Sequence, residues 1–215
     1  MSSWTIIWRV VLLLTPATLP SQPLQVPPFS SVETHDGAHV FIRQGSPQRV
    51  TLVEGTLDYS RITVDNGRLV IEKCVREHCP RGYQLDIEIV VPVITSLSIE
   101  SGGLLQTRGA FAPRGELTVS AHHGGTVDTR SLPVDKVSAF IEQGGRILTT
   151  AQRTLFATVT QGGHVEYWGD AQAKTSIKDG GVVTKGRKDE INKPAFDVQE
   201  LPAVPVIPVL PIHHH

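Results

Sequence analysis

One motif recurs along the second half of the chain, and its spacing decides the fold. The copies read SIESGGLL (98–105), SAHHGGTV (120–127), FIEQGGRI (140–147), TVTQGGHV (158–165) and SIKDGGVV (176–183). Their glycine pairs begin 22, 20, 18 and 18 residues apart. Apolar and polar residues alternate before the glycines, which is the period of a β-strand. We therefore expect each repeat to contain short strands joined at a bend.

Superposing the copies aligns apolar residues in two columns. Three residues before the first glycine stand Ile99, Ala121, Ile141, Val159 and Ile177. Three residues after it stand Leu105, Val127, Ile147, Val165 and Val183. A period near 20 is too short for a propeller blade and carries no helical spacing, so it favours an all-β solenoid, a parallel β-helix of about five coils. Successive coils would lie about 4.8 Å apart, with each column forming an inward ladder.

The first glycine of each pair is predicted to form a structural turn, because glycine takes positive φ without strain. These glycines are Gly102, Gly124, Gly144, Gly162 and Gly180. The polar residues just before them are expected to stack, on the inward side or at the bend: Ser101, His123, Gln143, Gln161 and Asp179. Thr107, Thr129 and Thr149 are expected to form a second polar ladder. We interpret both ladders as structural.

The residues before the repeats have a different sequence pattern. Asp36-Gly37 and Asn66-Gly67 each lie between short β-type segments, which predicts antiparallel hairpins. Residues 84–93 alternate apolar and polar, and Pro92 indicates that this strand ends there or lies at an edge. The hairpins, or the Pro-rich end of the chain, are available to cover an open end of the stack.

The two ends of the chain indicate export and an extended tail. Residues 1–25 have the apolar character of a secretory signal peptide, too short and too interrupted for a mature membrane span, with processing expected between Ala17 and Gln25. Residues 26–93 are expected to be the hairpin region, 94–188 the coils and 189–215 a Pro-rich tail. The tail's prolines recur every third residue from Pro202 to Pro211, the period of polyproline II.

Cysteine use and charge narrow the function. Cys74 and Cys79 are spaced for a local disulfide in an oxidising compartment. The chain has 20 Lys and Arg against 21 Asp and Glu, a net charge of −1, so no basic excess favours nucleic acid as a partner. No cofactor and no metal site is predicted.

One outward column is the candidate binding site. Two residues before the glycine pairs, Glu100 and Glu142 would flank His122 from the neighbouring coils. Such a column is typical of a solvated charge ladder, but it also has the side chains for acid–base chemistry or a metal. No catalytic triad is recognisable. Tyr167 and Trp168 are expected to cover an end coil rather than to stack on a sugar.

These features together resemble the head GIN domain of putative auto-transporter adhesins, a family of exported bacterial proteins. The resemblance rests on the segment from Phe29 to Gly55, the NGRLVIEK hairpin, IEIVVPVITSLSIESGG and the recurring Gly-Gly turns, and it extends to Trp168 or Val183. It implies a right-handed β-helix, a location in the envelope or at the cell surface, and adhesion. The segment from Cys74 to Cys79 departs from the family as a local insertion, and the residue before Gly-Gly is larger than the family's usual small one.

We therefore expect a protein secreted across the inner membrane to the periplasm or cell surface. It would act as a non-enzymatic, adhesin-like module of the bacterial envelope, with a glycan or an envelope protein as partner. Two alternatives stay open. One is a carbohydrate-active β-helix enzyme that uses Glu100, His122 and Glu142. The other is a passive periplasmic structural protein.

Overall fold

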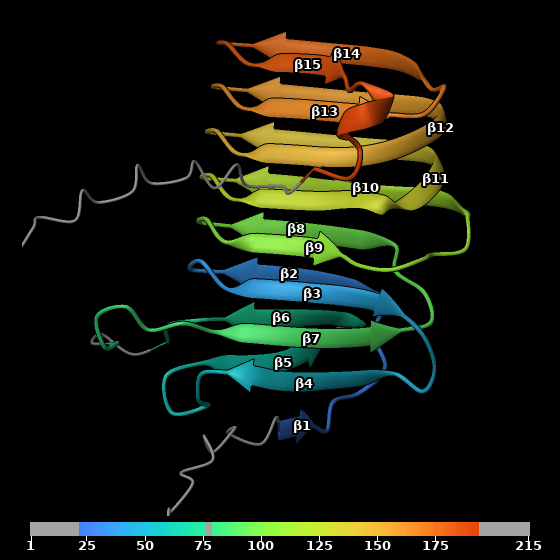
Figure 1. Ribbon diagram of the computed structural model, residues 1–215. Helices are drawn as coiled ribbons and strands as arrows, with labels where there is room; N and C mark the ends of the chain where they lie inside the picture. Colours follow the sequence, from blue (N-terminus) through green and yellow to red (C-terminus); the bar gives the residue numbers. More distant parts are fainter. Residues whose placement is uncertain (1–21, 76–78, 194–215) are drawn as a thin grey trace, which may run out of the picture.

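The computed structural model describes residues 22–75 and 79–193. All but one of its elements are strands, and they form one mixed, mostly parallel sheet of 15 strands that is curled so that two rows of strands face each other (Figure 1). The first row contains β5 (Arg61–Asp65), β6 (Arg68–Glu72), β2 (Ser31–His35), β8 (Ser96–Glu100), β10 (Arg114–His122) and β14 (Gln172–Lys178). The second row contains β1 (Gln22–Leu24), β4 (Arg49–Glu54), β7 (Asp86–Val91), β3 (His39–Gln44), β9 (Leu104–Thr107), β13 (His164–Trp168) and β15 (Val182–Lys185).

Two long strands belong to both rows. The first halves of β11 (Thr126–Glu142) and β12 (Arg146–Thr160) pair in parallel with β9 and β13 of the second row. Their second halves pair in parallel with β10 and β14 of the first row. Register shifts between Thr129 and Pro133 mark the place where the strands bend from one row to the other. In these two coils, one of the connections between the rows is therefore a bend within a continuous strand.

The repeat columns pair in register, as the sequence predicts. Ala121 lies opposite Ile99 on one side and Ile141 on the other, and Val159 lies opposite Ile141 and Ile177. The second column is equally regular: Leu105, Val127, Ile147, Val165 and Val183 are consecutive partners. These side chains fill the space between the rows, where most are fully buried. The two residues at the open end are the exceptions: Val183 is only partly buried, and Ile177 is 48% exposed because β14 pairs only with β12.

The glycine pairs form left-handed corners that connect the rows. The polar residue before each pair has φ between 54° and 64°, and both glycines have positive φ. Its backbone N–H donates to the next coil, as from His123 to Glu142 O and from Gln143 to Thr160 O, both at 3.0 Å. All five polar side chains are exposed. Of the two positions that the sequence left open for them, the corner is confirmed and the inward side of the strand is wrong. A residue with left-handed backbone conformation turns the chain, so the inward–outward alternation of the strand no longer applies to its side chain.

Asp36-Gly37 is also such a corner, and the predicted hairpin there is wrong. β2 pairs in parallel with β6 and β8, whereas β3 pairs in parallel with β7 and β9. The two strands therefore lie in different rows, each with neighbours on both sides. Asp36 has φ of 61°, and its N–H donates to Glu100 O at 3.2 Å, which is the hydrogen bond of the repeat corners. The repeat thus begins one copy earlier than the sequence motif suggests.

Antiparallel strands close one end of the stack. The predicted hairpin at Asn66-Gly67 is confirmed, with β5 antiparallel to β6. β4 is antiparallel to β7, and β1 to β4. β7 ends at Val91, as Pro92 predicts, and Leu85, Ile87, Ile89 and Val91 are buried. At the other end, every residue of β14 is exposed.

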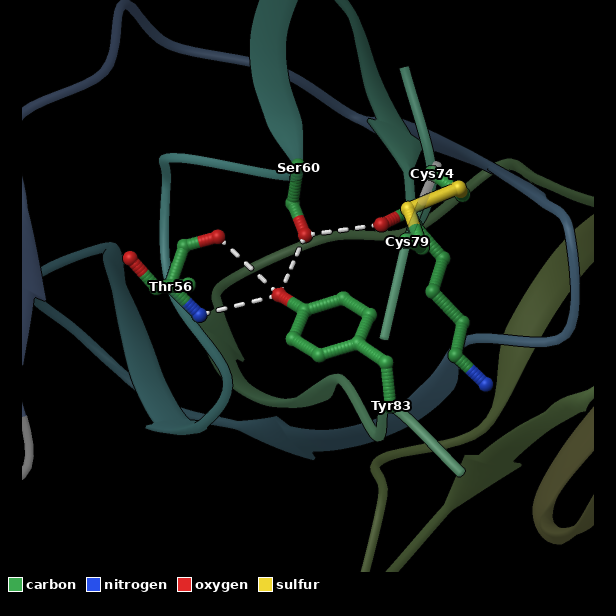
Figure 2. The surroundings of a disulfide bond; sticks show 6 residues. Thr56, Ser60, Cys74, Cys79 and Tyr83 are labelled. Atoms are coloured by element: carbon green, nitrogen blue, oxygen red, sulfur yellow. Dashed lines mark hydrogen bonds between the residues drawn. A yellow bond between two sulfur atoms is a disulfide. The ribbon is translucent and has the colours of Figure 1, made fainter. Parts of the chain in front are cut away.

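The predicted disulfide between Cys74 and Cys79 is present, at the loop that follows β6 (Figure 2). Beside it, the Tyr83 hydroxyl joins the loop to the turn before β5. Its Oη accepts a hydrogen bond from Thr56 N–H at 2.9 Å and lies 2.7 Å from Ser60 Oγ. Ser60 Oγ donates to Lys73 O at 2.9 Å. Hydrogen bonds of Tyr83 and Ser60 therefore hold the residues on either side of this loop to the turn before β5, and the disulfide closes the loop itself.

A short C-terminal segment, Gly186 to Lys193, crosses the outer surface of the second row and contains the 3₁₀ turn η1 (Lys188–Glu190). Trp168 is buried beneath it, with its indole N–H donating to Arg187 O at 2.8 Å, and packs with Leu148 and Ile191. The expected polyproline tail and most of the expected signal peptide lie outside the described residues. Among the described residues, no helix is long and apolar enough to span a membrane.

Candidate functional site

The predicted column of Glu100, His122 and Glu142 is assembled on the outer surface of the first row. The three residues are consecutive cross-strand partners at the ends of β8, β10 and β11. His122 Nε2 lies 3.8 Å from Glu100 Oε1, and His122 Nδ1 lies 3.3 Å from Glu142 Oε2. The parallel register places the side chains above one another because each strand ends at the same corner. The sequence thus located these neighbours correctly.

The geometry of the column favours ion pairing over convergence on a ligand. The two carboxylates contact different ring nitrogens on opposite sides of the imidazole. Within residues 22–75 and 79–193, no three His, Cys, Asp or Glu side chains are grouped so as to hold a metal ion. The side chains of His122 and Glu100 are each 29% exposed and that of Glu142 is 56% exposed.

The column continues beyond the predicted residues. Toward the closed end, His35 lies opposite Glu100 and Glu72. Arg61 of β5 forms an ion pair with Glu72, and this partner holds the pKa of the Glu72 carboxyl below its ordinary value. Acidic and histidine side chains therefore alternate along one edge of the first row. The sequence did not reveal this extension because the Asp36-Gly37 corner was interpreted as a hairpin.

An exposed aromatic ring beside the column is the feature that sequence reasoning missed. Phe140 points outward from β11 and is 42% exposed. Its cross-strand partners are Ser120 and Thr158, whose small side chains leave the ring uncovered. In the motif alignment, Phe140 stood out as the one apolar residue in a column of serines and threonines. That irregularity was the signal that could have identified it.

An open depression of about 490 Å³ surrounds this ring. Hydroxyl groups, one imidazole and one carboxylate border it, from Thr118, Ser120, His122, Glu142, Thr158 and Thr160. A second outward ring, Phe156, lies on the next strand and is 37% exposed. The ammonium groups of Lys136 and Lys174 lie 5.8 and 5.3 Å from the centre of its ring. The outer surface of β10, β11 and β12 around Phe140 is called here the Phe140 face.

The other predicted residues have structural positions. Thr129 and Thr149 are fully buried and joined by a hydrogen bond of 2.9 Å between their hydroxyls, and Thr107 Oγ1 donates to Asp128 O, so the second ladder is present. The first glycines of the pairs have positive φ, as predicted, but a Cβ on Gly102, Gly124, Gly144, Gly162 or Gly180 would meet open space. The second glycine of each pair is the crowded one. Trp168 is buried beneath the segment from Gly186 to Lys193, on a strand that has neighbours on both sides, so it is covered rather than covering an end coil.

Comparison with known proteins finds a family match for part of this chain. Residues 28–115 match the family model described as putative auto-transporter adhesin, head GIN domain. Over these residues, which are less than half of the chain, the sequence is similar to that family. The matched segment covers the closed end except β1 and includes the corners at Asp36-Gly37 and Gly102-Gly103. It stops within β10, short of the Trp168 expected from the motifs. The family's description names adhesion, which is a binding function.

Several solved structures match the chain at low identity and with TM-scores below 0.5. A putative adhesin from Bacteroides fragilis is 15% identical, with 77% of this chain and 96% of that one covered and a TM-score of 0.42. A putative cell adhesion protein from Clostridium sporogenes is 7% identical, with 78% and 100% covered and a TM-score of 0.38. A putative adhesin from Parabacteroides merdae is 11% identical, with 80% and 98% covered and a TM-score of 0.33. No curated protein matches the chain.

Proposed function

We propose that this protein is an exported, non-enzymatic, adhesin-like module that binds extended glycans on its Phe140 face. The observation that carries the proposal is the exposure of Phe140 within a border of hydroxyl, imidazole and carboxylate groups. An exposed aromatic ring covers the apolar face of a sugar ring, while polar groups around it bond the hydroxyls. Two outward phenylalanines on adjacent strands group exposed apolar surface on this face, and such grouped surface marks interaction sites.

The openness of this face supports binding rather than turnover. Most enzymes close an active site around the reacting bond and expel water from it. An open depression does not do this. It does admit a chain that continues in both directions across the strands, from coil to coil. A repeated surface, in which consecutive coils present similar hydroxyls about 4.8 Å apart, suits a polymer of repeating units.

We also propose the finer fold and location that the sequence predicts. The parallel in-register coils support a right-handed β-helix over residues 94–188, preceded by the 26–93 region and followed by the tail from 189. The disulfide between Cys74 and Cys79 supports an oxidising, extracytoplasmic compartment, the periplasm or cell surface. Because Gln22–Leu24 pair with β4, signal processing before Gln22 would keep that strand, and we place the cleavage there.

A glycan array probed with the mature domain, with and without calcium or zinc, tests the proposal. We expect metal-independent binding to a restricted set of glycans, and loss of that binding in Phe140→Ser. Val53→Ala, which shortens an apolar residue 46% exposed on β4, is the matched control and should bind normally. If no glycan binds and an envelope protein is captured through the same face, the partner is a protein and the glycan proposal is wrong. No binding of either kind would support the passive structural role.

A carbohydrate-active enzyme is the second candidate, and one observation favours it. The imidazole of His122 lies between two carboxylates at 3.8 and 3.3 Å, an arrangement that can move a proton. The enzyme hypothesis predicts that the wild-type protein releases reducing ends from a bound glycan and that His122→Ala abolishes the release while binding persists. Intact glycan after prolonged incubation at high protein concentration excludes it.

A further inference from the structure

A buried ion pair on the opposite surface of the molecule belongs to none of the features above. Asp128 and Arg130 lie on the outer side of the second row, yet their side chains are only 4% and 9% exposed. The segment from Gly186 to Lys193 crosses over them, and Arg130 Nη1 donates to Glu190 O at 3.3 Å. The guanidinium also lies 5.4 Å from the Trp168 ring. Burying two charges costs solvation free energy, and a hydrophobic pair would hold this segment at lower cost.

A pocket of about 300 Å³ opens beside this ion pair. Its walls come from β9, β11 and the crossing segment, and they are polar except for one side chain. The lining residues are Gln106, Thr107, Asp128, Arg130, Ser131, Ile191, Asn192 and Lys193. The pocket and the Phe140 face lie on different rows, so a ligand here would be a separate one.

The hydrogen bonds already made in the pocket define what it can still accept. The Asp128 carboxylate receives four, from Arg130 N, Nε and Nη2 and from Gln106 Nε2, at 2.7–3.2 Å. Those bonds fill its lone-pair positions. Arg130 uses three of its five N–H groups, toward Asp128 and Glu190, and so keeps two. The pocket therefore has spare donors on Arg130 and no spare acceptor on Asp128.

The remaining groups suit a ligand that carries both a carboxylate and hydroxyls. Lys193 adds an ammonium group, 61% exposed at the mouth, which donates one hydrogen bond to Glu190 Oε1 at 3.2 Å and keeps its other N–H groups. Ser131 Oγ donates to Thr107 at 2.7 Å and keeps its lone pairs for a ligand hydroxyl. The Asn192 amide can donate and accept, and Ile191 offers an apolar surface to a ring. We infer that this pocket binds a carboxylate-bearing sugar unit, with the carboxylate at Arg130 and Lys193 and the hydroxyls at Ser131 and Asn192.

NMR titration of the full chain tests this inference with three probes. Glucuronate carries both groups, glucose lacks the carboxylate, and lactate has the carboxylate without the ring. We expect glucuronate to shift the amide signals of Ser131 and Asn192 and the Trp168 indole signal, and to bind at least tenfold more tightly than glucose or lactate. Equal binding of lactate would identify a site for small hydroxy acids, and equal binding of glucose would overturn the role of the carboxylate.

Two lysine variants separate the pocket from general surface charge. Lys193→Gln removes one charged donor from an exposed position and should weaken glucuronate binding about tenfold without changing the fold. Lys178→Gln, on exposed β14, is the control and should bind as the wild type does. Equal effects of the two variants, or no shift at Ser131 and Asn192, would refute the pocket. Phe140→Ser should leave glucuronate binding intact, so the proposal for the pocket and the proposal for the Phe140 face are tested independently.

Discussion

At the scale of single residues, the two glycines of a corner have different structural roles. Gly162 and Gly163 both have positive φ, at 88° and 111°. A Cβ on Gly162 would meet nothing within 4 Å, whereas one on Gly163 would lie 2.5 Å from Ile141 Cγ2 and 3.1 Å from Gly145 O of the coil below. The second glycine is needed for close stacking of coils as well as for its backbone conformation.

This asymmetry gives a matched pair of substitutions. Gly162→Ala should lower the free energy of unfolding by about 1–2 kcal/mol, the conformational cost of a β-carbon at positive φ. Gly163→Ala should cost about 1–3 kcal/mol more, because the methyl group also overpacks the coil interface. Urea denaturation of both variants measures the difference. Equal losses would mean that the corners are not held in close contact.

The same corners show why part of the fold was predictable from sequence and part was not. The apolar columns could be aligned because identical coils place identical side chains inward. Asp36-Gly37 could not be distinguished from a hairpin, since both turns use positive φ and only the pairing of β2 and β3 with other strands decides between them. The burial of Asp128 and Arg130 depends on the distant segment after Gly186, for which no local pattern exists.

At the scale of elements, the threonine ladder joins β11 to β12 inside the core. Thr129 Oγ1 donates to Thr149 Oγ1 at 2.9 Å, and both side chains are fully buried. Thr129→Val keeps the shape but leaves the Thr149 hydroxyl without this partner, which should cost about 1–2 kcal/mol. The double variant Thr129→Val/Thr149→Val should cost less than the sum of the single changes, because it removes both polar groups. Additive losses in a double-mutant cycle would show that the ladder contributes no coupling.

The last coil carries a pH-sensitive contact between β13 and β15. Burial lowers the pKa of His164, against the raising effect of Glu166, and its Nε2 lies 2.7 Å from Thr184 Oγ1. The unfolded chain therefore takes up this proton at a higher pH than the folded chain does. The free energy of unfolding should fall as the pH drops through the ordinary histidine range, from about 7 toward 5.

His164→Gln should remove this part of the pH dependence while keeping a polar partner for Thr184. The measurement is the urea midpoint of wild type and variant across that pH range, compared as a difference so that the other histidines cancel. A wild-type midpoint that falls no faster than that of His164→Gln on acidification would contradict the assignment.

At the scale of the whole molecule, the stack has one closed end and one end that no described residue covers. Val159 on β12 is fully buried and is the direct cross-strand partner of Ile177, which is 48% exposed on β14. Val159→Ala should cost about 1–3 kcal/mol through lost packing, whereas Ile177→Ala should cost well under 1 kcal/mol if the end is open in solution. A loss at Ile177 as large as that at Val159 would show that another part of the chain, or a second molecule, covers β14.

The closed end carries the family's matched segment, and the repeats add the surface on which we place binding. In this account the fold supplies a flat, regular support, and one irregular residue, Phe140, gives it a ligand site. Calorimetric titration of the glycan selected on the array, with wild type, Phe140→Ser and Phe140→Tyr, tests that claim most directly. We expect Phe140→Ser to weaken binding at least tenfold and Phe140→Tyr, which keeps the ring, to stay within about threefold of wild type. An unchanged affinity in Phe140→Ser would contradict the account.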